Sequence, residues 1–125
     1  MALERPEIDM PEGDIPFDLL VEDVVVGDGD EATPGSKVTV HYVGVAFRTG
    51  EEFDASWNRG EPFRFALGKG QVIPGWDQGV AGMRVGGRRK LTIPSALAYG
   101  ARGAGNGVIA PHEPLVFVVD LLAVD

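Results

Sequence analysis

The chain has 125 residues, a formal net charge of −8 and no cysteine, and its length corresponds to one domain. The absence of cysteine excludes a disulfide framework, a thiolate nucleophile and any cysteine-based metal site. The first residues lack the basic start and apolar run of a secretion signal, and no stretch is apolar enough to span a bilayer. We therefore expect a cytoplasmic protein without a membrane partner.

The negative charge is concentrated at the start of the chain. Residues 1–31 hold eleven acidic residues and one basic residue, whereas the remainder holds eight acidic and ten basic residues. A nucleic-acid-binding domain normally has clustered positive charge that outweighs its acids. Only the basic residues between positions 84 and 90 approach that pattern, so we expect no nucleic acid as a partner.

Residues 1–17 form an acidic, proline-containing segment that we predict to be an extended or mobile arm. The segment has few large apolar side chains, so it cannot bury enough surface to offset the entropy cost of ordering. The domain is predicted to span residues 18–125. Two hypotheses remain open for the basic side chains that could face this arm: a solvated surface, or a docking surface for the arm itself. These side chains are Arg84, Arg88, Arg89 and Lys90.

Several runs of residues predict an antiparallel β-sheet. Residues 19–26 are rich in β-branched side chains and are followed by a turn cluster at 27–30. Residues 37–46 alternate in the way a half-buried strand does, with Val38, Val40 and Tyr42 on one face. Further strands are predicted at 63–65, 88–93 and 114–122. The connections between these runs are mostly too short for the crossover helices that parallel strands need.

One segment predicts a helix. Residues 74–83 begin with a proline at a plausible first helical position and place Trp76, Val80 and Met83 at helical spacing. Three glycines within the segment disfavour a helix by about 1 kcal/mol each, so only tertiary packing would stabilise it. We expect an α+β fold in which one short helix lies across the apolar face of the sheet.

Side chains for metal or nucleophilic chemistry have no supporting context. His41 and His112 lack further ligands nearby in sequence, and metal sites need three or four. Ser36, Ser56 and Ser95 have no nucleophile-elbow pattern around them. The glycine-rich run 100–107 lacks the Gly-Lys-Ser/Thr ending of a phosphate-binding loop, and we interpret it as a mobile surface loop. We expect neither a metal nor a cofactor.

Aromatic residues remain as the candidate site. Seven of the ten aromatic residues are strung along the predicted domain, several of them beside glycine or turn signals. From composition alone they could be ordinary core or the walls of a binding pocket. They are Tyr42, Phe53, Phe63, Phe65, Trp76, Tyr99 and Phe117.

Short motifs surround these residues in a specific order. They include Val-His-Tyr-Val-Gly at 40–44, Phe-Asp-Ala-Ser at 53–56, Val-Ile-Pro-Gly-Trp at 72–76 and Ala-Tyr-Gly at 98–100. From about residue 18 to the C-terminus, the chain resembles the FKBP-type peptidyl-prolyl cis-trans isomerases, the tacrolimus-binding immunophilins. The resemblance implies a bent antiparallel sheet wrapped around one short α-helix, with a target proline ring in the hollow between them.

The resemblance also implies the site residues. Tyr99 hydroxyl and the Ile73 amide would donate hydrogen bonds to substrate carbonyls, and Gln71 would offer its backbone carbonyl. Catalysis would rest on Asp54, Tyr99, Phe53 and Trp76. Ligand binding would involve Tyr42, Phe53, Asp54, Phe63, Gln71, Val72, Ile73, Trp76, Tyr99, Ile109 and Phe117.

Two departures from the family pattern bear on the pocket rim. Leu97 stands where many relatives have an aromatic residue, and the 100–107 loop is glycine-rich and slightly longer than the best-known form. Both bear on substrate preference and inhibitor affinity. The implied partners are proline-containing polypeptides as substrates and tacrolimus- or rapamycin-type macrolides as inhibitors, bound by a monomer.

Two questions remain open from the sequence. Asp54 could interact electrostatically with the rotating carbonyl, or it could shape the pocket by pairing with Arg59 or with Tyr42 hydroxyl, which we favour because an unpaired carboxylate beside aromatic walls is costly. The pocket could also serve a binding module that does not catalyse rotation. A folding chaperone is a third alternative, but it would need additional apolar surface and no insertion supplies it.

Overall fold

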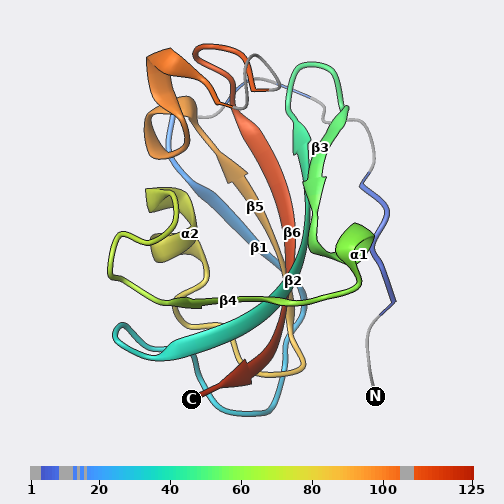
Figure 1. Cartoon of the computed structure of the whole chain (residues 1–125), viewed down its shortest axis with the longest axis vertical. Helices are drawn as coiled ribbons and strands as arrows, with labels where there is room; N and C mark the ends of the chain where they lie inside the picture. Colours follow the sequence, from blue (N-terminus) through green and yellow to red (C-terminus); the bar gives the residue numbers. More distant parts are fainter. Residues whose placement is uncertain (1–3, 9–12, 14, 16, 105–108) are drawn as a thin grey trace.

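Six strands form one antiparallel sheet in the computed structural model, which describes residues 4–8, 13, 15, 17–104 and 109–125 (Figure 1). The strands lie in the order β1-β5-β6-β2-β3, and β4 pairs with the first part of β2 beside this path. Their bounds are β1 (Leu20–Val25), β2 (Lys37–Ala46), β3 (Glu52–Ala55), β4 (Phe63–Ala66), β5 (Arg88–Ile93) and β6 (Leu115–Val124).

The helical elements are short. They are α1 (Ser56–Arg59), α2 (Pro74–Gly79) and two 3-10 helices, η1 (Ser95–Leu97) and η2 (Gly100–Arg102). The α+β fold with an antiparallel sheet is confirmed, with α1 as a second α-helix that the sequence did not predict. The helix predicted for 74–83 ends at Gly79, four residues early, although Val80 and Met83 are still buried.

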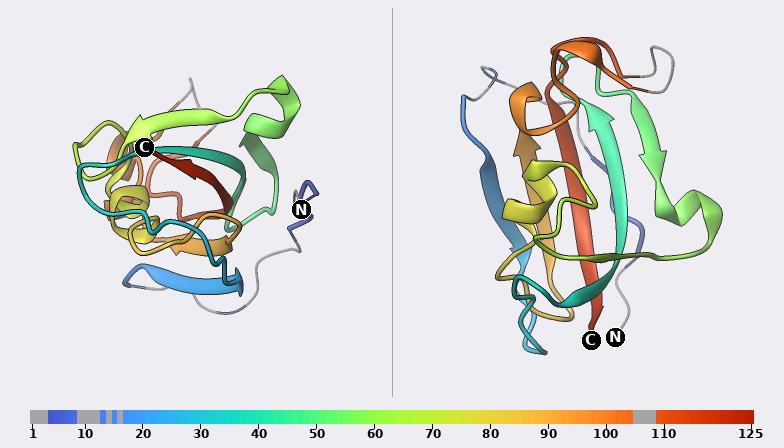
Figure 2. Two further views of the ribbon diagram at one scale, coloured as in Figure 1. Left: turned by 90° about the horizontal axis from the view of Figure 1, so that it is seen from below. Right: turned by 60° about the vertical axis from the view of Figure 1, so that its left-hand side comes forward.

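Helix α2 lies on the concave face of the sheet, very close to β5 (Figure 2). A Cβ atom built on Gly75 would be 2.5 Å from Ile93 Cγ2, and one built on Gly79 would be 2.7 Å from Leu91 Cδ2. The glycines that weaken the helix intrinsically therefore allow its close contact with the sheet. That contact supplies the tertiary packing that a helix of this sequence needs.

The burial pattern of the long strand β2 changes along its length. Its first half alternates between buried and partly exposed side chains, as predicted, but residues 42–46 are buried on both faces. The outer face is covered in part by the N-terminal segment, because Ile8 packs against a cluster of Val45, Phe47 and Val116. The half-buried pattern therefore holds only where no second layer covers the strand.

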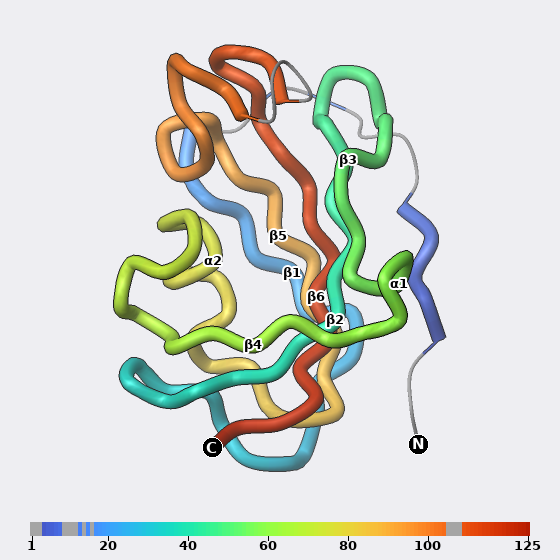
Figure 3. Tube along the Cα trace, in the orientation of Figure 1, coloured from blue at the N-terminus to red at the C-terminus, as the bar shows by residue number. Residues whose placement is uncertain are grey.

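Residues 4–8 run along the outer face of the sheet beside β3 and α1 (Figure 3). Pro6 is buried, Arg5 pairs with Glu52 on β3, and Arg88 donates a hydrogen bond to the Glu4 carbonyl. Residues 1–3, 9–12, 14 and 16 of the predicted arm lie outside the described residues.

The basic residues near β5 are paired mainly with acidic residues of strand β1 and its following loop. The pairs are Arg84 with Glu31, Arg89 with Asp23, and Lys90 with Glu22. Arg88 forms an ion pair with the buried Asp120, at 2.6 Å. Within the described part of the chain, Arg88 is the one of these four basic residues that forms a hydrogen bond with the segment 4–8.

None of the helices in the described part of the chain has the length and apolar character that crossing a bilayer requires.

Candidate active site

A pocket of about 190 Å³ opens between α2, β3, β4 and the segment that carries Tyr99. Ten of the eleven residues predicted to bind the ligand line it. They are Tyr42, Phe53, Asp54, Phe63, Gln71, Val72, Ile73, Trp76, Tyr99 and Phe117. The eleventh, Ile109, is not among the lining residues; it is buried in the main core cluster beneath.

Trp76 forms the floor of the pocket, and the aromatic walls pack against it. Helix α2 brings its ring centroid to 4.9 Å from that of Tyr42 and 5.2 Å from that of Phe117, both edge to face. Phe53 in turn meets Phe117 edge to face at 5.4 Å. Such T-shaped contacts are favoured between aromatic rings. They hold the walls as a rigid, apolar surface.

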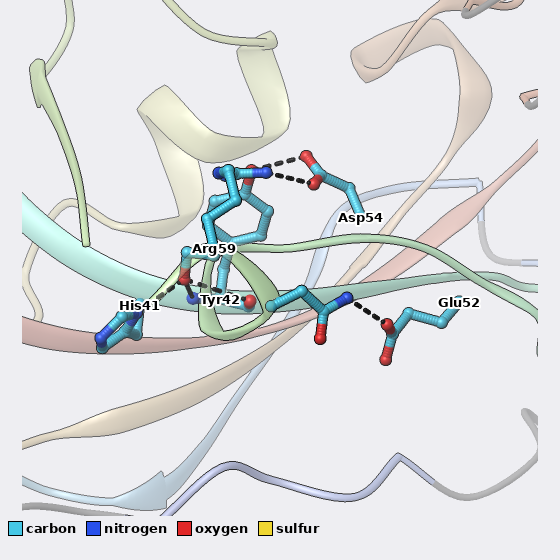
Figure 4. Close-up of polar contacts among 7 residues, drawn as sticks. His41, Tyr42, Glu52, Asp54 and Arg59 are labelled. Carbon is cyan, nitrogen blue, oxygen red and sulfur yellow. Dashed lines mark hydrogen bonds and ion pairs between the residues drawn. The ribbon is translucent and has the colours of Figure 1, made fainter. Parts of the chain in front are cut away.

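Asp54, Tyr42 and Arg59 form a closed polar triangle at the pocket edge (Figure 4). Tyr42 hydroxyl donates to Asp54 Oδ2 at 2.5 Å, and Arg59 donates to Asp54 Oδ1 and to the Tyr42 hydroxyl oxygen, each at 2.8 Å. Burial, reinforced by the hydrogen bond to Asp54, raises the pKa of Tyr42, so its hydroxyl stays protonated. Both structural contacts weighed for Asp54 are therefore present together.

Ser56 anchors the backbone beneath this triangle. Its side chain is fully buried, and its Oγ accepts a hydrogen bond from the Tyr42 amide at 2.7 Å. The same oxygen contacts His41 Nδ1 at 2.8 Å, and the His41 ring stacks on Trp57. From the sequence, Ser56 is a serine without nucleophile context and the last residue of the Phe-Asp-Ala-Ser motif, and this structural role is not predicted. The sequence feature that could have indicated this structural role is the position of Ser56 directly after Phe-Asp-Ala, because β3 ends at Ala55.

Glu52 links β3 to two other segments. Figure 4 shows Glu52, which accepts a hydrogen bond from Asn58 of α1 at 3.0 Å. Glu52 also forms an ion pair with Arg5. The Asn58 hydrogen bond, helped by Arg5, lowers the pKa of Glu52. The strand that carries two pocket residues is thus tied to α1 on one side and to the N-terminal segment on the other.

Two hydrogen-bond donors are available at the pocket. Tyr99 is 40% exposed, and burial of part of its ring, with the charge of Asp54, raises the pKa of its hydroxyl. The Ile73 amide makes no hydrogen bond to any described residue. The Gln71 side chain is occupied, because its Oε1 accepts from the Ala66 amide at 2.9 Å.

Metal ligands do not gather at this pocket or elsewhere in the part of the chain that the structure describes. No group of three or more histidine or acidic side chains there could hold a metal ion.

Comparison with known proteins decides the family. The model of a family described as FKBP-type peptidyl-prolyl cis-trans isomerase matches residues 29–122. The chain belongs to this family. Among FKBP-type relatives, an FK506-binding protein of Streptomyces anulatus is 65% identical over 124 residues, which cover 99% of this chain and 100% of the relative. The peptidyl-prolyl cis-trans isomerase FPR2 of Saccharomyces cerevisiae is 56% identical over 104 residues, covering 83% of this chain and 73% of the relative.

Solved structures agree with the FKBP assignment. The crystal structure of AtFKBP13 superposes with a TM-score of 0.77 at 43% identity and covers 84% of this chain and 91% of that one. The chain therefore has the fold of an FKBP, and it belongs to a class of enzymes that isomerise X-Pro bonds.

Proposed function

We propose that this FKBP accelerates rotation about X-Pro peptide bonds by holding the proline ring in the aromatic pocket. The observation that carries the proposal is the pocket itself: an apolar floor at Trp76, aromatic walls, and hydrogen-bond donors at Tyr99 and Ile73. The protein acts on proline-containing polypeptides as a cytoplasmic monomer.

The mechanism follows from amide resonance. The barrier to rotation is roughly 18–20 kcal/mol because resonance gives the C–N bond partial double-bond character. The planar amide is more polar than the twisted one, so an apolar pocket favours the twisted state. Each tenfold acceleration needs only about 1.4 kcal/mol of preferential binding to that state. The side chains here can supply this by enclosing the ring while the preceding carbonyl swings towards the polar edge.

An isomerase assay tests the proposal. Short Ala-X-Pro-Phe peptides in which X is varied, followed by exchange NMR or by a coupled protease, should show catalysed isomerisation that saturates with substrate. Binding of the same peptides without any increase in rate would instead establish a non-catalytic proline-binding module. The series would also show which residue is favoured before proline.

Asp54→Asn should lower both stability and activity modestly. The amide can still accept a hydrogen bond from Tyr42, but it lacks the charge that pairs with Arg59. Because the Asp54 and Arg59 side chains are 41% and 52% exposed, we expect the loss in the free energy of unfolding to be about 1 kcal/mol or less. Urea unfolding and the peptide assay would measure both effects. Arg59→Ala serves as the matched control: if Asp54 shapes the pocket, both variants lose kcat/KM to a similar degree.

A direct electrostatic role of Asp54 predicts a different pair of results. Arg59→Ala would then keep its activity while Asp54→Asn loses it. If Asp54→Asn kept full turnover and full stability, neither catalysis nor folding would require the negative charge of the Asp54 carboxylate.

Tyr99→Phe should weaken ligand binding by about 1 kcal/mol, the net value of one hydrogen bond, or roughly fivefold in Kd. The ring remains in place, so stability should not change. Calorimetric titration with a proline peptide and with tacrolimus would measure the loss. An unchanged Kd for both ligands would exclude the Tyr99 hydroxyl from the site.

Macrolides of the tacrolimus or rapamycin type are the inhibitors that we propose for this pocket. The support comes from the pocket lining and from relatives that carry the name FK506-binding protein. Leu97 packs partly buried against the core cluster and is not among the residues that line the pocket. A macrolide would therefore lack the contact that an aromatic ring at this position could provide, which should reduce its affinity. Residues 105–108 of the neighbouring loop lie outside the described residues.

A further inference from the structure

The loop between β4 and α2 carries part of the pocket wall. Residues 67–73 make up this loop, which is drawn in yellow-green (Figure 1). Three of its residues, Gln71, Val72 and Ile73, line the pocket. The loop, all of which the structure describes, contains neither a helix nor a strand. Contacts with neighbouring elements must therefore determine its shape.

Two glycines of the loop direct their amides at one side chain of α2. Gly68 has a φ of 77° and Gly70 a φ of 71°, in the left-handed region that residues other than glycine rarely adopt. The Gly68 amide donates to Asp77 Oδ1 at 2.8 Å, and the Gly70 amide donates to Asp77 Oδ2 at 3.1 Å. Hydrogen bonds to a charged acceptor are stronger than those between neutral groups. The carboxylate thus ties the loop to the helix that bears Trp76.

Other contacts fix the two ends of the loop. The Leu67 amide donates to the Ser36 carbonyl at 2.9 Å, and the Ile73 carbonyl accepts from the Trp76 amide at 2.9 Å. Within the described part of the chain, the backbone of residues 68–72 forms hydrogen bonds only with the carboxylate on α2. The middle of the loop therefore depends on that carboxylate.

The Gln71 side chain supplies a further tie, on the side of β4. Its Oε1 accepts from the Ala66 amide at 2.9 Å, where β4 ends. This bond connects the loop to the strand and not to the helix. If the Asp77 carboxylate were removed, the pocket residues of the loop would lose their link to α2 until Ile73 is reached.

Charge alone is the alternative role for Asp77. The residue lies in the first turn of α2, where a negative charge stabilises a helix through its dipole. Asp77 is not among the residues that line the pocket, so it has no direct contact with a ligand there. A role through charge and a role through contact differ in one respect, because a charge placed elsewhere on α2 could restore only the first.

We propose that Asp77 is a positioning residue for the isomerase reaction, which keeps the loop in place around Trp76 before a substrate arrives. This inference rests on the proposed function. Without the carboxylate, the loop would adopt further conformations, and substrate binding would have to order it. If the binding-competent conformation fell to about a tenth of the molecules, the apparent affinity would fall about tenfold.

Asp77→Ala tests the role through a separation of KM from kcat. On a short proline peptide, we expect KM to rise about tenfold while kcat stays within about twofold of the wild type, because the bound loop makes the same contacts in both. Calorimetric titration with the same peptide should show the same weakening. Asp77→Asn is a second, milder variant: its amide oxygen can accept a hydrogen bond but its nitrogen cannot, so its KM should lie between the two.

Hydrogen exchange measures the loop without a substrate. In NMR spectra of the folded proteins, the Gly68 and Gly70 amides of Asp77→Ala should exchange with solvent about tenfold faster than those of the wild type. If the wild type failed to isomerise the peptide, the proposed function would be contradicted, and the exchange rates would still report whether Asp77 holds the loop.

Two control variants separate contact from charge. Gln78 follows Asp77 in α2 and is exposed, so Gln78→Ala should leave KM and both exchange rates unchanged. The double variant Asp77→Ala/Gln78→Glu returns a negative charge to α2 without placing it against the loop. It should keep the raised KM and the fast exchange.

Four results would overturn the proposal. An unchanged KM in both Asp77 variants, or unchanged exchange of the two glycine amides, would show that the loop keeps its shape without the carboxylate. Recovery of the wild-type KM in the double variant would assign the effect to the charge on the helix. A fall in kcat at unchanged KM would mean that Asp77 acts in the transition state and not through the position of the loop.

Discussion

Trp76→Ala is expected to lower the free energy of unfolding by about 3–5 kcal/mol, in the range measured for truncating a buried aromatic side chain. Trp76 is 4% exposed, and its ring contacts Tyr42, Phe65 and Phe117. Removing it leaves a cavity where the pocket floor was, and the surrounding rings lose their mutual support. Urea unfolding followed by circular dichroism would measure the stability loss, and the peptide assay the accompanying loss of activity.

A control variant must distinguish the activity lost through lower stability from the activity lost through damage to the pocket. Phe47→Ala removes another buried aromatic side chain, one that packs in the cluster on the outer face of the sheet, away from the pocket. We expect it to lower stability by several kcal/mol as well, while the folded protein keeps its kcat/KM. If Phe47→Ala lost activity as completely as Trp76→Ala at a temperature where both are folded, Trp76 would have no special place in the site.

The strands that carry a strong local pattern were predicted well. The bounds of β2 and β5 coincide with the predicted runs. In β2 the alternation of the first half and the several valines favour a strand. Strand β3 was not predicted, since its four residues, Glu-Phe-Asp-Ala, have little intrinsic preference for a strand. It forms by pairing with β2 between Val43 and Val45, a contact between segments that sequence periodicity does not reveal.

Helix α1 was missed for a related reason. It has four residues and no side-chain cap, which is too little for a periodic signal to detect. Its importance comes from position: it turns the chain after β3 so that Arg59 reaches back to Asp54 and Tyr42. Elements this short depend on their surroundings, so their existence follows from the tertiary fold.

In the candidate site, too, some features could be predicted from the sequence and others depend on the tertiary fold. Residue type and spacing could not decide whether the aromatic residues were core or pocket, because packing and binding use the same side chains. Phe65 is a core residue that does not line the pocket. Of the residues that do line it, Trp76 is buried, whereas Phe63 and Tyr99 are partly exposed. The order of motifs identified the residues, and the structure supplied the polar triangle and the outer-face packing of residues 4–8.

Gly44→Ala is expected to reduce activity strongly, because the added methyl group meets two aromatic walls of the pocket. Gly44 lies on β2, paired with Asp54 on one side and Phe117 on the other. A Cβ atom there would be 2.6 Å from Phe117 Cε1 and 2.7 Å from Phe53 Cζ, so both rings must move. Overpacking of this kind costs about 1–3 kcal/mol, and the rings that move are two walls of the pocket.

The expected kinetic result is a fall in kcat/KM of tenfold or more, since losing about 1.4 kcal/mol of transition-state binding has that effect. Gly29→Ala is the matched control, because its Cβ would lie 2.7 Å from Val85 Cβ, and neither residue lines the pocket. It should lose stability but not activity. If Gly44→Ala kept full kcat/KM, catalysis would tolerate displacement of Phe53 and Phe117, and the walls would serve only to exclude water from the proline ring.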